Sequence, residues 1–81
     1  MNHFYVLRSE KDNKLYKGST SDLTKRLLDH KMGRVIATKN RRPLQLIYTE
    51  EFATYNEALA REKDSKTLKG GKKLKGIIDC L

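Results

Sequence analysis

Five residues of this sequence have side chains that could act together on a phosphate group: Tyr5, Tyr16, Arg26, His30 and Glu62. Cleavage of a phosphodiester needs a cation on the phosphate, a hydroxyl that orients or deprotonates water, and oxygen ligands for a metal ion. The set contains each of these groups. Each residue also has an ordinary structural explanation, so the elements that carry them decide whether they can meet.

The tyrosines lie in a predicted β-hairpin. Residues 4–8 (FYVLR) are aromatic and β-branched, residues 9–13 (SEKDN) suit a polar turn, and residues 14–18 (KLYKG) suit a second short strand. Tyr5 and Tyr16 could then face the same side of a sheet. Such residues are ordinarily core or cross-strand aromatics, and this alternative stays open.

A helix is predicted directly after the hairpin. Thr20 or Ser21 can cap it, and Asp22 falls in its first turn. The helix should run to about His30, with Gly33 ending it.

Leu23 and Leu27 mark the inward stripe of this helix, at about 100° per residue. Arg26 and His30 lie one turn apart on the edge of that stripe and should point along the sheet surface. The alternative is a solvated pair, with Arg26 extended over apolar surface and His30 as a surface residue.

The second half of the chain predicts one more strand and one or two helices. A basic connection leads to a strand over residues 44–52 (LQLIYTEEF). Thr54 followed by Glu57 fits a capping box, which predicts a helix over residues 55–68 that Lys-Gly-Gly stops. Residues 72–80 form a short terminal helix or an ordered tail.

Glu62 falls inside the stripe of this second helix that should meet the sheet. It shares that face with Tyr55, Ala58, Leu59 and Lys66. A buried carboxylate is costly unless it is paired or binds a metal. A salt bridge to a lysine or arginine and a metal site therefore both remain open.

These elements predict one α+β domain over residues 1–81, with a small three-stranded antiparallel sheet flanked by helices in the order ββαβα(α). Lysine and arginine number 18 against 10 acidic residues, a formal net charge of +8. Nucleic acid is the first candidate partner and an anionic membrane surface the second. No apolar run approaches the roughly 18 residues of a spanning helix, and no signal peptide is recognisable, so we expect a cytoplasmic protein without a membrane anchor.

Several short motifs follow one another in a recognisable order. The triplet HFY at residues 3–5 and the triplet YKG at residues 16–18 are followed by SDLTKRLLDH, KNRRP, LQLIYTEEF and EALAREKDSK. This order resembles the GIY-YIG nuclease superfamily, in particular its short members that consist of little more than the nuclease module. The resemblance covers about residues 3–78, and both motif tyrosines are kept.

The resemblance implies a role for each of the five residues. Tyr5 and Tyr16 would sit at the catalytic centre, one of them as general base or water-orienting group. Arg26 would hold the scissile phosphate, and His30 would assist at the phosphate or in proton transfer. Glu62 would bind a single divalent cation, Mg²⁺ or Mn²⁺. The implied reaction is in-line attack of water on phosphorus.

Basic residues beside these motifs are expected to contact phosphates, although such segments can equally be solvated loops and helix faces. The side chain at position 17 should face away from Tyr16, because successive strand residues alternate faces. The residues expected to contact nucleic acid are Lys17, Lys39, Arg41, Arg42 and Lys66.

The sequence thus predicts a metal-dependent endonuclease acting on DNA rather than RNA, in structured or damaged DNA as in repair. The alternative is a module on the same fold that binds nucleic acid without cutting it. It is motivated by the absence of any asparagine after Asn56, where many nucleases of the family have one. A basic structural protein of a ribonucleoprotein is a third hypothesis. We expect a monomer, with a protein partner for targeting because no reader module is present.

Overall fold

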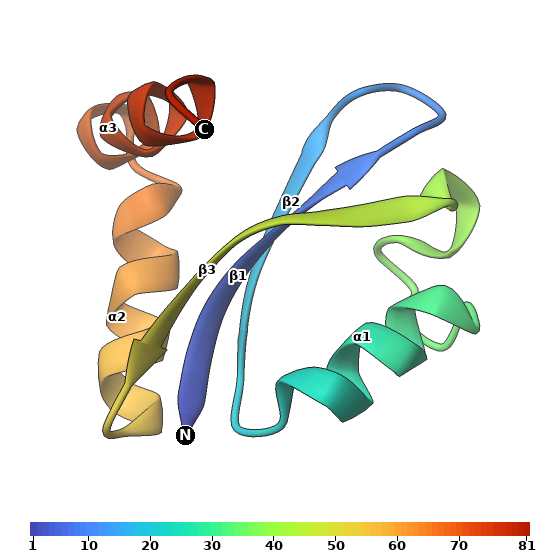
Figure 1. The fold of residues 1–81 in the computed structure, drawn as a ribbon, viewed down its shortest axis with the longest axis horizontal. Coiled ribbons are helices and arrows are strands. Elements are labelled where there is room, and N and C mark those ends of the chain that lie inside the picture. Colours follow the sequence, from blue (N-terminus) through green and yellow to red (C-terminus); the bar gives the residue numbers. More distant parts are fainter.

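The computed structural model describes all of residues 1–81 and contains a three-stranded sheet with three α-helices (Figure 1). The elements follow the predicted α+β order, ββαβαα, with a short 3-10 helix before the third strand. None of the helices has the length and apolar character that crossing a bilayer requires. The elements are β1 (Asn2–Ser9), β2 (Leu15–Thr20), α1 (Leu23–Lys31), the 3-10 helix (Lys39–Arg41), β3 (Leu44–Phe52), α2 (Tyr55–Ser65) and α3 (Leu68–Asp79).

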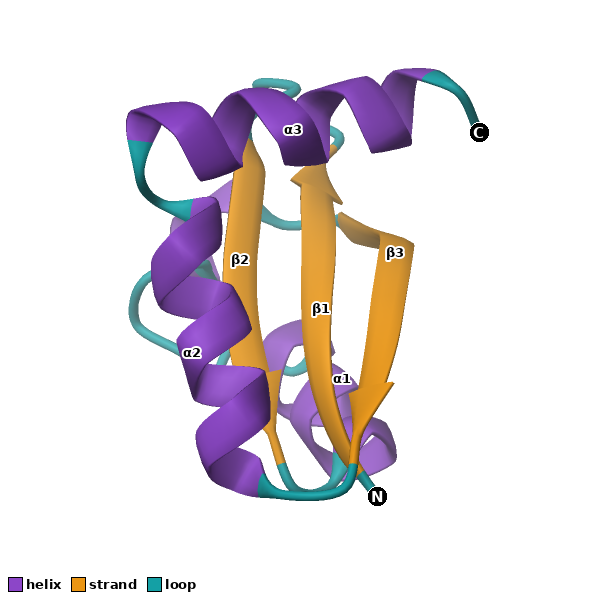
Figure 2. Cartoon of the chain, turned by 90° about the vertical axis from the view of Figure 1, so that its left-hand side faces the viewer, coloured by secondary structure: helices purple, strands orange, loops and turns teal.

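The sheet is antiparallel with the strand order β2-β1-β3, so β1 is the central strand. Helices α2 and α3 cover one face, and α1 lies against the opposite face (Figures 1 and 2). α2 runs alongside β2, whereas α3 crosses one end of the sheet (Figure 2). Because side chains alternate along a strand, β1 sends successive residues into two different environments.

The hydrophobic core lies between the sheet and the α2–α3 pair. Phe4 and Val6 of β1 pack with Leu74 and Ile78 of α3, and none of the four is more than 8% exposed. Partly buried residues around this cluster are Leu15, Ile47, Tyr48 and Phe52. Apolar burial on this face therefore holds the sheet and α3 together.

β3 contains a β-bulge that changes which face its side chains meet. Val6 pairs with Tyr48 but Leu7 pairs with Leu46, so Ile47 is an extra residue without a partner on β1. Directly paired residues of antiparallel strands lie on the same face. Tyr48 therefore joins the core beside Val6, whereas Leu46 lies with Leu7 on the α1 face.

Each α-helix begins with a side-chain cap. The Asp22 carboxylate accepts from the Lys25 amide, so Asp22 caps α1 in place of the serine and threonine before it, and the prediction that it lies in the first turn is wrong. Thr54 accepts from the Glu57 amide, which confirms the predicted start of α2. Thr67 caps α3 in the same way. These caps satisfy amide groups that have no partner within the helix.

The predicted end of α1 is confirmed, but the predicted end of α2 is wrong. Gly33 follows the α1 C-cap with a φ of 78°, in the left-handed region that favours glycine. α2 ends at Ser65, short of Leu68, and the glycine pair lies near the start of α3 instead of stopping a helix. A Cβ atom at Gly70 would overlap the Asp64 carbonyl oxygen. The glycine therefore lets α3 begin directly against the end of α2.

Candidate active site

The hairpin places the two motif tyrosines side by side on the α1 face. Tyr5 on β1 pairs with Gly18 on β2, and a Cβ atom at Gly18 would lie 2.5 Å from the Tyr5 hydroxyl. The rings of Tyr5 and Tyr16 are 6.4 Å apart between centroids. Tyr5 is buried, whereas Tyr16 is half-buried. The glycine of the YKG motif is needed because it leaves room for the Tyr5 ring.

His30 of α1 completes a buried chain of hydrogen-bonding groups. Its Nε2 lies 2.9 Å from the Tyr5 hydroxyl, and its Nδ1 lies 2.8 Å from the Thr38 hydroxyl. Tyr16 packs edge-on against the same imidazole, at 5.2 Å between ring centroids. His30 is 1% exposed and is the only buried residue of α1. The alternative of a surface histidine is therefore wrong.

Burial keeps this chain of groups uncharged at neutral pH. Desolvation, with a smaller contribution from the positive charge of Arg26, lowers the pKa of His30 to about 4. Burial likewise raises the pKa of Tyr5. A neutral imidazole has one N–H and one bare nitrogen. His30 therefore donates to one of its two hydroxyl neighbours and accepts from the other.

Arg26 lies against both tyrosines from one turn earlier in α1. Its interaction with the Tyr5 hydroxyl raises the pKa of the Arg26 guanidinium, and Tyr16 acts in the same direction. Arg26 therefore places a fixed positive charge beside the Tyr5 hydroxyl, which also lies against Nε2 of His30.

Glu62 of α2 contacts Ser19 of β2, on the face of the sheet opposite the tyrosines. Its Oε1 accepts from the Ser19 hydroxyl at 2.7 Å, and its Oε2 accepts from the Lys66 ammonium at 2.8 Å. The carboxylate adds to the rise in the pKa of Tyr5, behind burial as the main cause. The Glu62 side chain is 17% exposed, in agreement with its predicted inward position. The salt bridge that the sequence left open is present.

Comparison with known proteins assigns this arrangement to a family. Residues 1–75 match the model of the GIY-YIG catalytic domain. The chain belongs to the GIY-YIG family. The sequence resemblance is thereby confirmed, and nuclease-type chemistry on a nucleic acid is the activity that the GIY-YIG domain implies.

Relatives of similar length extend this assignment. UPF0213 protein SSP2268 of Staphylococcus saprophyticus is 45% identical over 78 residues, 95% of each chain. UPF0213 protein YazA of Bacillus subtilis is 44% identical over 73 residues, 89% of this chain and 74% of that one. The solution NMR structure of the UPF0213 protein BH0048 from Bacillus halodurans superposes with a TM-score of 0.55 at 29% identity, over 95% of this chain and 85% of that one. None of these names states a reaction.

GIY-YIG nucleases generally depend on a divalent cation. The oxygen atoms of Glu62 and Ser19 are suitable ligands for such an ion. Mg²⁺ prefers oxygen ligands and keeps several waters, so one carboxylate with substrate phosphate oxygens is sufficient. Lys66 engages one Glu62 oxygen, but its side chain is 55% exposed and can turn toward solvent. No group of three or more histidine, cysteine, aspartate or glutamate side chains forms another candidate metal site.

The five basic residues predicted to contact nucleic acid differ in their surroundings. Lys17 faces away from the tyrosines, as expected, and donates to a backbone carbonyl at the end of α2 at 3.0 Å. Arg42 donates to two backbone carbonyls, and Arg41 and Lys66 each lie beside a carboxylate. Lys39 is exposed, and its ammonium has no such partner. Phosphate contacts by these residues remain a prediction.

The sequence patterns do not identify two residues of this GIY-YIG site, Thr38 and Ser19. Thr38 is fully buried in the loop after α1, where it fixes Nδ1 of His30. Ser19 on β2 holds Glu62. Strand alternation places Ser19 on the face opposite Tyr16, which is the one signal that could have found it. The position of Thr38 depends on how its loop folds back.

Proposed function

We propose that this chain is a divalent-metal-dependent endonuclease that hydrolyses phosphodiester bonds in DNA. The observation that carries the proposal is the meeting of Tyr5, Tyr16 and Arg26 around a buried, neutral His30 in a GIY-YIG chain of net charge +8. Polar groups are costly to bury, and titratable groups with shifted pKa values cluster at functional sites. We extend the proposal to DNA in preference to RNA, and to structured or damaged DNA, on the basis of the family resemblance.

Arg26 would bind the scissile phosphate. Its fixed positive charge would stabilise the negative charge that develops around phosphorus, and its fork of donors suits phosphate oxygens. Tyr5 acts here as a positioning residue, because it lies between Arg26 and His30 and is itself buried. A guanidinium that is already in place needs little reorganisation when the substrate arrives.

Tyr16 is the better candidate for the group that orients the attacking water. The buried Tyr5 phenol has a raised pKa, so it stays protonated and is a poor base. Tyr16 is half-buried and lies beside the guanidinium that would hold the phosphate. Its hydroxyl oxygen can accept a hydrogen bond from a water placed for in-line attack.

Glu62, with the Ser19 hydroxyl beside it, would hold the metal ion. A bound ion would supply positive charge to stabilise the leaving oxygen. Glu62 and Arg26 come from opposite faces of the sheet, on α2 and α1 respectively. The phosphate would therefore lie between them at the β2 edge, with the tyrosines beside it.

The proposal is tested by cleavage of labelled single strand, duplex, flap, four-way junction and RNA hairpin with Mg²⁺, Mn²⁺ or EDTA. The wild type is expected to cut with a metal ion and not in EDTA. Glu62→Gln is expected to lower the rate at least about a hundredfold, because it removes the charge that holds the ion. Glu57→Gln, at the exposed start of α2, is the matched control and should cut normally.

Two outcomes would count against the proposal in different ways. Cutting by Glu62→Gln at the wild-type rate would contradict the metal-site assignment alone. No cutting of any substrate by the wild type, with either metal, would contradict the nuclease activity.

One observation favours a non-catalytic binding module as the second candidate. Both Glu62 oxygens are engaged, by Ser19 and by Lys66, in a pairing that is complete without a metal ion. This alternative expects tight, salt-sensitive binding without cutting, unchanged by Glu62→Gln. Lys39→Glu should weaken that binding, because the Lys39 ammonium is exposed. The slope of log K against log salt concentration should also become shallower by about one or more.

A further inference from the structure

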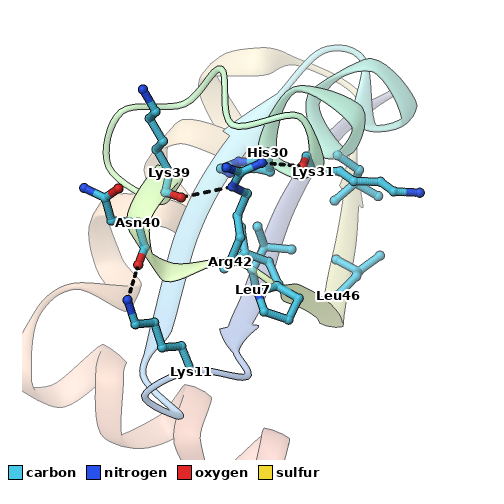
Figure 3. A pocket seen from close by; sticks show the side chains of 11 residues that line it. Leu7, Lys11, His30, Lys31, Lys39, Asn40, Arg42 and Leu46 are labelled. Atoms are coloured by element: carbon cyan, nitrogen blue, oxygen red, sulfur yellow. Dashed lines mark hydrogen bonds between the residues drawn. The ribbon is translucent and has the colours of Figure 1, made fainter.

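A cleft lies on the α1 face, and His30 is among the side chains that line it (Figure 3). This cleft of about 890 Å³ opens between the end of α1, the 3-10 helix and the first residues of β3. This volume is within the usual range of small-molecule sites. The apolar side chains that line it are Leu7, Leu27, Pro43, Leu44 and Leu46.

Four cations surround this apolar lining, and none of them is paired with a carboxylate. Lys11 and Arg42 donate to backbone carbonyls, at 3.3 Å for Lys11 and at 3.0 and 3.1 Å for Arg42. Lys31 and Lys39 extend toward opposite sides of the opening (Figure 3). No aspartate or glutamate lines the cleft. The cleft therefore suits a ligand with an apolar body and a negative charge.

The walls of the cleft are fixed by the fold. Arg42 joins the end of α1 to the 3-10 helix through the carbonyls of Lys31 and Lys39 (Figure 3). The bulge at Ile47 turns Leu46 toward the cleft instead of the core. An apolar surface that is formed before binding loses little entropy when a ligand arrives.

We propose that this cleft binds one unpaired nucleotide of the nucleic acid, with the base against the leucines and the proline and its phosphate at the cationic rim. This inference rests on the proposed function. A base within a duplex has both faces covered by its neighbours, so only an unpaired or extruded base can bury a face here.

One side chain, that of His30, separates the cleft from the candidate active site. His30 lines the cleft, and its Nε2 lies 2.9 Å from the Tyr5 hydroxyl. His30 therefore lies between the cleft and Tyr5, so a nucleotide in the cleft would be a neighbour of the one at the tyrosines. The substrate class that this geometry selects is nucleic acid with an unpaired nucleotide next to the bond that is cut.

The inference is tested by fluorescence anisotropy in EDTA, where no metal-dependent cutting occurs. Three labelled duplexes are compared: fully paired, with a one-nucleotide bulge, and with the same bulge carrying an abasic analogue. The wild type should bind the bulge that has a base about tenfold more tightly than the abasic one. Leu46→Asp should remove this difference, and the fully paired duplex measures how far the added negative charge weakens binding in general.

The matched control is Ile77→Asp on α3, because Ile77 is 41% exposed and Leu46 is 39% exposed. This control should keep the preference for the base. Leu46→Ser, which removes the apolar side chain without adding charge, should lose it, and it replaces Leu46→Asp if that variant melts at a lower temperature.

The inference is overturned by equal binding of the two bulges, by a preference that survives in both Leu46 variants, or by failure to bind any duplex. Displacement of the bulge by a low concentration of free 5′-dAMP would also overturn it, because the cleft would then be a site for free nucleotide. Base preference without cutting on the cleavage panel would contradict the nuclease and leave the cleft assignment standing. Cutting without base preference would support the nuclease and contradict the cleft assignment.

Discussion

The two faces of β1 are equally buried but are held in different ways. Phe4 and Val6 on one face and Tyr5 and Leu7 on the other are all at most 2% exposed. The first pair contacts apolar side chains of α3, whereas Tyr5 meets the imidazole of α1 through a hydrogen bond. Burial alone therefore does not separate structural from functional residues. The groups that a buried side chain contacts do separate these two kinds of residue. On the α1 face, where the contacts are polar, we expect substitutions to alter activity more than stability.

Removal of the charge of Arg26 gives the sharpest test of this division. Arg26→Gln should lower the cleavage rate about a thousandfold, because the cation on the phosphate is lost. The free energy of unfolding should change by less than about 0.5 kcal/mol, since the side chain is only half-buried. Cleavage assays and urea denaturation measure the two quantities. Lys25→Gln, the exposed neighbour, is the control, and a loss of stability that matches the loss of rate would break the comparison.

The opposite pattern is expected on the α3 face. Leu74 is fully buried in the core, so Leu74→Ala should lower the free energy of unfolding by about 3 kcal/mol through lost burial and a residual cavity. The cleavage rate per folded molecule should stay close to that of the wild type at low temperature. Leu68→Ala, at a position that is 80% exposed, should leave stability nearly unchanged. A specific loss of activity in Leu74→Ala would show that the two faces are coupled.

The pH dependence of stability should reveal the buried histidine. The pKa of His30 falls from 6.5 to about 4 on folding, so the unfolded chain binds the proton more readily between these values. This contribution is complete above pH 6.5 and is lost as the pH falls toward 4, by roughly 3 kcal/mol in all. Denaturation of the wild type and of His30→Gln across this range measures the difference. Lys25→Gln should retain the full dependence, and an equally steep loss in His30→Gln would contradict the assignment.

The smallest expected effect concerns Lys66, whose ammonium forms a salt bridge with Glu62. Lys66 competes with a metal ion for one Glu62 oxygen, so Lys66→Ala should lower the Mg²⁺ concentration for half-maximal cleavage, by about twofold to fivefold. Lys63→Ala, on an exposed position of the same helix, is the control. A higher Mg²⁺ requirement in Lys66→Ala would show that this lysine assists the site instead of competing for it.

Local sequence patterns account for much of the site. The order of the GIY-YIG motifs, the alternation that separates Lys17 from Tyr16, and the periodicity that turns Glu62 inward all depend on neighbours within a few residues. The same local rules misplace the boundary between α2 and α3. Glycine usually ends a helix, whereas Gly70 is needed for the close approach to the Asp64 carbonyl.

The remaining features depend on contacts between distant segments. Thr38 reaches His30 only because the loop after α1 folds back over the helix end. The alternation of apolar and polar residues in β3 gives no signal of a bulge at Ile47. The bulge is recognised only from the pairing of β3 with β1. The cleft depends on both, so no pattern within one element predicts it.

The bulge at Ile47 also affects how the sequence of this protein could evolve. Residues 44 and 46 serve the cleft, and the residues after the bulge serve the core, so one strand carries two sets of positions under separate constraints. Substitutions in the first set can alter ligand preference without reaching Tyr48 or Phe52. Variation in selectivity is thereby available at little risk to folding, and the first three residues of β3 are the natural place to introduce it in the laboratory.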